Sequence, residues 1–174
     1  VVMPLAGSLP FVWLDARQQR EYRRLLAAGD EAVTRGQTLE AIEAFSGALT
    51  LKPDSMIARL MRGETYRQRG EFASAVRDLR EAAALDPSAP RPLELLGDAH
   101  AAMSQHTAAV NDYESSLHLD DRAPRVVSKL GLAHYRSGDI PKAIEALRRA
   151  VSHDERLPQA HYLLRVRGSS MRDA

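Results

Sequence analysis

Residues 63–87 read GETYRQRGEFASAVRDLREAAALDP, and this pattern of small and large side chains returns every 34 residues along the chain. The small residues that recur at this spacing are Gly29, Gly63, Gly97 and Gly131, followed by Ala41, Ala75, Ala109 and Ala143. A larger residue lies four places after each alanine: Phe45, Leu79, Tyr113 and Leu147. A fixed period of this length indicates an array of stacked repeats.

Each period predicts two helices joined by a short turn. Leu60, Gly63 and Tyr66 share one helical stripe, and a second stripe follows on the next helix. Between the two helices lies a glycine in three of the four periods, where a helix end requires a residue tolerant of positive φ: Gly36, Gly70 and Gly138. The third period has Ser104 at this place, so its turn should be strained or differently shaped. Glycine and alanine at matched places would let the paired helices approach closely.

The second period resembles the tetratricopeptide repeat family at its signature places, which are Gly63, Tyr66, Gly70, Ala75, Ala82 and Pro87. The early tryptophan of that family is replaced in all four units, and His100 and His134 replace the tyrosine. The resemblance implies an all-α, right-handed superhelical solenoid of about four helix-turn-helix units. We expect one array over residues 17–167, with repeats at 22–55, 56–89, 90–123 and 124–157 and a capping helix at 158–167.

The two ends of the chain depart from the repeat. Residues 1–16 are apolar, and a long helix is predicted to begin at Asp15. Two interpretations of this leader stay open: a loosely ordered segment, or a contact segment in which Phe11, Trp13 and Leu14 dock on another surface. Residues 168–174 are predicted to be a frayed tail.

Several classes of chemistry find no support in the sequence. The chain has no cysteine, and its six histidines show no spacing typical of a metal site. No phosphate loop, nucleophile motif or convergent carboxylate pair is present, which argues against an enzyme and against a bound cofactor. A net charge of +1 gives no pull toward nucleic acid. No stretch approaches the roughly 18 apolar residues that span a bilayer, and no compartment is assigned beyond a slight preference for the cytoplasm over the periplasm.

In the family that the chain resembles, the first helix of each unit lines a concave face. The resemblance carries this role to Asp30, Glu64, Arg67, Arg91, Glu94, Asp98, Arg125, Leu132, Tyr135, Arg136 and Tyr162. Asp30, Glu64 and Asp98 would form an acidic column, which Leu132 interrupts beside the two tyrosines. This predicts a basic partner segment with an apolar anchor. The alternative is that nearby arginines neutralise the acids, with Glu64–Arg67 and Arg91–Glu94 pairing along their own helices.

Some members of this family bind the C-terminal carboxylate of a chaperone through basic and amide side chains. At the corresponding places this chain carries Leu26, Asp30, Glu64, Glu94 and Asp98. Four carboxylates would repel that ligand, so we exclude this ligand class.

The resulting hypothesis is a non-catalytic adaptor that binds a peptide or helix of a partner protein in its concave groove. Two alternatives stay open. One is a regulatory or assembly region of a larger enzyme or envelope complex. The other is a scaffold that self-associates through its N-terminal segment or its capping helix.

Overall fold

The computed structural model describes residues 9–154 and 158–170, and within these ranges the side chains from residue 16 to 165 except those of residues 153 and 159. In this part of the chain every regular element is a helix, and there is no strand. The helices are α1 (Leu9–Thr34), α2 (Thr38–Leu51), α3 (Met56–Gln68), α4 (Phe72–Leu85), α5 (Pro90–Ala102), α6 (His106–Leu119), α7 (Pro124–Ser137), α8 (Ile140–His153) and α9 (Pro158–Ser170).

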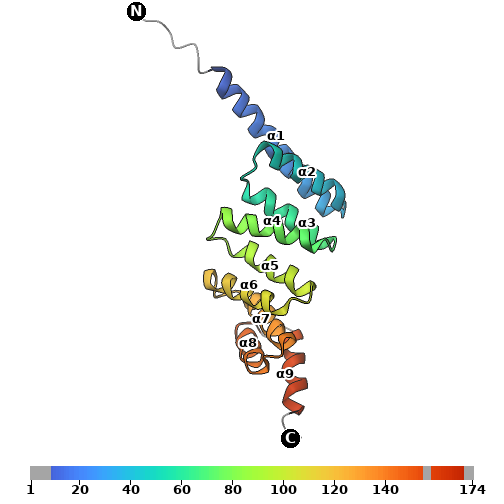
Figure 1. Ribbon diagram of the computed structural model, residues 1–174, viewed down its shortest axis with the longest axis vertical. Helices are drawn as coiled ribbons and strands as arrows, with labels where there is room; N and C mark the ends of the chain where they lie inside the picture. The colour runs from blue at the N-terminus through green and yellow to red at the C-terminus, as the bar shows by residue number, and fades with distance from the viewer. Residues whose placement is uncertain (1–8, 155–157, 171–174) are drawn as a thin grey trace, which may run out of the picture.

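The helices follow one another along the long axis of the molecule, and α1 and α9 lie at opposite ends of the stack (Figure 1). Each helix packs mainly on the helices before and after it in sequence. The most extensive contacts are within the pairs α1–α2, α3–α4, α5–α6 and α7–α8. The expected all-α solenoid of helical pairs is therefore confirmed.

The recurring glycines lie where the two helices of a pair come closest. A Cβ atom on Gly63 would lie 2.9 Å from Cγ of Leu79, and one on Gly131 would lie 2.7 Å from Cγ of Leu147. Gly29 and Gly97 face Phe45 and Tyr113 in the same way. Because real Cβ atoms do not approach neighbours so closely, glycine at these places permits the tight pairing that the 34-residue pattern predicts.

The turns inside the helical pairs use the left-handed backbone conformation. Gly36, Gly70 and Gly138 have φ values of 74°, 81° and 90°, and Ser104 adopts the same region with φ of 60°. The third turn therefore keeps the shape of the others, and its serine carries the strain that a side chain brings to this region.

Replacing Ser104 with glycine is expected to stabilise the protein by about 1 kcal/mol, because the left-handed conformation costs a non-glycine residue roughly that much. Urea unfolding followed by circular dichroism measures the change. Gly70→Ser is the matched control at the equivalent turn, and it should lose a similar amount. Equal stability of wild type and Ser104→Gly would show that the turn is unstrained.

The first helix begins earlier than the sequence predicts. The structure starts α1 at Leu9, not at Asp15, because Pro10 falls in the first turn, where its missing N–H costs nothing. Gln18 Nε2 donates to the carbonyl of Leu51 at the end of α2, at 2.9 Å. The turns of α1 before Gln18 consequently extend beyond α2, as Figure 1 shows.

The last helix is longer than expected. α9 ends at Ser170, three residues beyond the expected cap and inside the segment expected to be a frayed tail. It packs on α8 and, to a smaller extent, on α7. Ala160 is fully buried in this contact, so α9 covers the end of the array as a cap does. Residues 1–8 and 171–174 lie outside the described residues.

Candidate interaction surface

The first helices of the pairs, together with α9, carry the side chains that the sequence assigns to the concave face. We call this surface the first-helix face. It is defined by α1, α3, α5, α7 and α9. Asp30, Arg91, Arg125, Arg136 and Tyr162 are exposed there. The other assigned side chains are half-buried: Glu64, Arg67, Glu94, Asp98, Leu132 and Tyr135.

Six charged side chains on α3, α5 and α7 form a continuous set of ion pairs, which we call the charge ladder: Glu64, Arg67, Arg91, Glu94, Asp98 and Lys129. Arg91 bridges two helices, because its guanidinium lies 3.0 Å from Glu64 on α3 and 2.8 Å from Glu94 on its own helix. Arg67 approaches Glu64 at 3.8 Å. The ladder thus joins the second repeat to the third.

Lys129 of α7 continues the ladder into the fourth repeat. Its Nζ lies 2.7 Å from Glu94 and 2.8 Å from Asp98, both on α5. Burial alone would raise the pKa of Glu94, but the hydrogen bonds and charges of Lys129 and Arg91 outweigh it and hold that pKa below its usual value. Glu94 is therefore ionised at neutral pH. Asp98 also accepts a hydrogen bond from the hydroxyl of Tyr113 at 2.8 Å, and burial raises the pKa of that tyrosine, which stays protonated.

The ladder favours the alternative in which the acids of this face are neutralised within the array. Both ion pairs expected along single helices form, Glu64–Arg67 and Arg91–Glu94. Lys129 was missed by the sequence analysis. The sequence could have revealed it, because a lysine stands here where the second and third repeats carry Met61 and Leu95. Within the described residues, Asp30 is the acid of the expected column that takes part in no ion pair.

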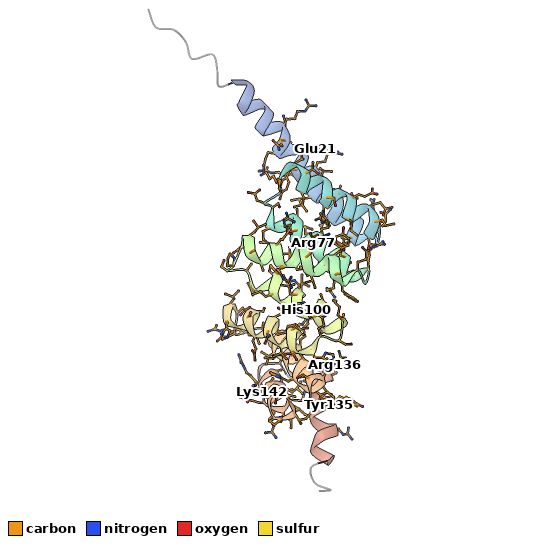
Figure 2. All side chains as sticks on the ribbon, viewed as in Figure 1. Glu21, Arg77, His100, Tyr135, Arg136 and Lys142 are labelled. Carbon is orange, nitrogen blue, oxygen red and sulfur yellow. The ribbon has the colours of Figure 1, made fainter. Side chains whose placement is uncertain are left out.

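The fourth repeat differs from the others on this face. Arg125 and Arg136 of α7 form no ion pair with any described residue. Tyr162 of α9 is 66% exposed, and Ile57 of α3 is 52% exposed on the same face. Figure 2 places Tyr135 and Arg136 together beside α7 and α9. The surplus charge of this end of the face is therefore positive, and the exposed ring of Tyr162 lies at the same end.

Of the apolar leader, the structure describes the backbone from residue 9 onward. Phe11, Trp13 and Leu14 lie in the part of α1 that extends beyond α2, and their side chains lie outside the described residues. The proposed contact role of this segment therefore stays a prediction.

A second set of polar contacts lies inside the helical pairs rather than on the face. Asp78 of α4 is fully buried and receives two bonds from Arg62 of α3, at 2.6 and 2.9 Å. Arg62 also donates to Ser46 of α2 at 3.0 Å. Asp112, 34 residues after Asp78, pairs with Nδ1 of His100 at 2.5 Å. Burial raises the pKa of Asp112 despite this partner. The contacts of Asp78 and Asp112 hold the helices of a pair together, and the bond from Arg62 to Ser46 joins the second pair to the first.

The described part of the chain contains no group of three or more histidine, aspartate or glutamate side chains arranged to hold a metal ion. In the same residues, no helix is both long and apolar enough to cross a bilayer.

The paired helices and the small-residue period define an α-solenoid, and the sequence profile of the tetratricopeptide repeat family matches residues 26–90 and 94–164. The chain belongs to the tetratricopeptide repeat family. Among curated protein sequences none matches it.

Solved structures with the same fold include a MamA protein, which is 25% identical, has a TM-score of 0.82, and matches over 89% of this chain and 86% of its own. The O-GlcNAc transferase mutant K341M of Thermobaculum terrenum is 25% identical with a TM-score of 0.71, over 78% of this chain but 26% of its own. The first tetratricopeptide domain of Spaghetti (RPAP3), bound to the HSP90 peptide SRMEEVD, is 22% identical with a TM-score of 0.59, over 74% and 94% of the two chains.

Proposed function

We propose that this protein is a non-catalytic adaptor that binds a segment of a partner protein on its first-helix face. Membership of the tetratricopeptide repeat family carries this proposal. The similar RPAP3 domain was solved with a bound peptide, which supports peptide binding as the mode. A stack of packed helices is a rigid surface, so binding an extended segment costs little ordering of the protein itself.

The charge ladder limits where a basic segment of the partner could bind. The sequence predicted a basic partner facing an acidic column, but Glu64, Glu94 and Asp98 already have cationic partners. A basic segment would find Asp30 at the α1 end of the face. The exposed Ile57 and Tyr162 provide apolar contacts, and aromatic side chains are frequent anchors in protein interfaces.

The test is capture of partner proteins from an extract of the source cells, with the intact chain as bait. The double variant Ile57→Asp, Tyr162→Ala is expected to lose a specific partner, because both side chains are exposed on the first-helix face. Leu119→Asp is the matched control: Leu119 is 44% exposed on α6, a second helix. Retention by the double variant, or equal loss in the control, would contradict the proposal.

Self-association is the competing explanation that the extension of α1 beyond α2 favours. Light scattering of the bait, with and without residues 1–16, separates it from partner capture. An intact bait that is monomeric and still captures its partner supports the adaptor. An oligomeric bait that becomes monomeric without residues 1–16, and captures nothing, supports the self-associating scaffold.

A further inference from the structure

A small cavity opens between α5, α6 and α7, at the end of the charge ladder. Its volume is about 40 Å³, and its lining residues are Ala101, His106, Tyr113, Lys129, Leu132, Ala133 and Arg136. One water-sized atom occupies roughly 10–15 Å³ of such space. The cavity therefore holds roughly three atoms of that size, which is the number of heavy atoms in a carboxylate group.

Three of the lining residues differ from their counterparts in the neighbouring repeats by introducing an imidazole or a positive charge. His106 stands at the place of Phe72 and Ile140 in the neighbouring repeats. Lys129 stands at the place of Met61 and Leu95. These substitutions come from different helices and meet at one point, which packing of the repeat does not require.

The third difference is Arg136, at the place of Gln68 and Ala102. It is exposed, and it forms no ion pair with any described residue. In the charge ladder three cations balance three carboxylates, since Arg67, Arg91 and Lys129 face Glu64, Glu94 and Asp98. Arg136 consequently adds a positive charge at the cavity that the carboxylates of the ladder do not balance.

The donors at the cavity are incompletely used. Nδ1 of His106 is buried, and no hydrogen-bond partner for it exists among the described residues. A buried ring nitrogen left unpaired costs about 1–3 kcal/mol. Lys129 has three ammonium hydrogens, of which Glu94 and Asp98 accept two. In the tautomer that carries its hydrogen on Nδ1, the imidazole can donate to a guest, and so can the remaining ammonium hydrogen.

We propose that this cavity binds a carboxylate, presented by an acidic side chain of the partner segment. The carboxylate would be bound by His106, Lys129 and Arg136, while Leu132, Ala101 and Ala133 would contact the methylene group next to it. The two ladder carboxylates closest to the cavity, Glu94 and Asp98, oppose this guest, and Lys129, which bonds both, screens it from them. The inference rests on the proposed function for its partner, but the cavity can be tested without one.

Propionate is the probe, because it joins a carboxylate to a short apolar stem, and propionamide is its uncharged match. Titration of the intact protein is followed by the ring resonances of His106 in two-dimensional NMR, assigned with His106→Phe. We expect saturable shifts with propionate and none with propionamide. Equal shifts with both probes, or no shift with either, would overturn the proposal and leave a cavity that holds water.

Arg136→Gln is expected to weaken propionate binding by about tenfold or more, the effect of losing one charge-assisted hydrogen bond. Arg125→Gln is the matched control, because Arg125 is an exposed arginine of the same helix that does not line the cavity. Equal weakening by both variants would mean that propionate responds only to general charge, and would overturn the site.

A second experiment, with short peptides, distinguishes whether the bound carboxylate comes from a side chain of a partner segment or from a free small acid. The acetylated, amidated peptide Ala-Leu-Glu-Leu-Ala is compared with its glutamine version. Binding of the glutamate peptide at the His106 resonances, without binding of the glutamine peptide, supports the acidic side chain. Binding of propionate without binding of the glutamate peptide would overturn that source. Since this experiment uses no natural partner, its failure would leave the adaptor proposal to be judged by partner capture alone.

Discussion

Replacing Asp78 with alanine is expected to lower the free energy of unfolding by about 3–5 kcal/mol, because the change leaves the charge of Arg62 buried without its partner. Asp78 is 0% exposed and accepts two bonds from the guanidinium at 2.6 and 2.9 Å. The hydrogen bond that Arg62 donates to Asp78 is the largest cause that raises the pKa of the arginine in the wild type. In the variant the arginine still keeps its charge, because a guanidinium does not lose its proton at neutral pH. Urea unfolding at neutral pH measures the loss.

The matched control removes both charges together. In Arg62→Met, Asp78→Leu the pair is replaced by apolar side chains of similar volume, and the loss should be much smaller than in Asp78→Ala, because no buried charge is left alone. Asp30→Ala tests the exposed case and should change stability by less than about 0.5 kcal/mol. A double variant as unstable as Asp78→Ala would show that packing, not charge, dominates at this place.

Replacing Gly63 with leucine is expected to cost about 1–3 kcal/mol, the usual range for overpacking a close contact. A Cβ atom at this place would lie 2.9 Å from Cγ and 3.1 Å from Cδ2 of Leu79, and 3.3 Å from Cβ of Asp78. Leucine favours helices over glycine by roughly 1 kcal/mol, so any net loss reports the clash. Thermal and urea unfolding measure it.

Ala28→Leu is the control for the added volume, because Ala28 is exposed on α1, also a first helix, and makes no such contact. Its stability should be unchanged or slightly raised. If Gly63→Leu were as stable as Ala28→Leu, the helices of the second pair would have room for a side chain, and the packing account of the 34-residue period would fail.

The fold could be predicted from the sequence because its signal is local and repeated. The sizes of Gly63, Ala75 and Leu79 indicate how closely two helices approach, and the four copies of the pattern lead to the same prediction. The Glu64–Arg67 and Arg91–Glu94 pairs could be predicted for the same reason, since partners three residues apart share a helix face.

Contacts between helices of different repeats were harder to predict from the sequence. Lys129 bonds Glu94 and Asp98 across 35 and 31 residues. The face positions were assigned by resemblance to the family, and Lys129 was not among them. The Arg62–Asp78 pair was missed because a buried charge on an apolar stripe interrupts the periodicity on which the prediction relied. The helix predicted to begin at Asp15 begins at Leu9 in the structure, since the first turn of a helix tolerates Pro10.

The near-neighbour packing of the nine described helices has a consequence for how the molecule opens and closes. With few contacts between distant parts of the chain, folding requires little loop closure and should be fast for this length. Local unfolding can begin at either end of the array without disturbing the middle repeats. We therefore expect it to start at α9 and at the first turns of α1. A partner that contacts several helical pairs at once would bind only when those pairs are folded. Its binding free energy would therefore also stabilise the two ends of the array against local unfolding.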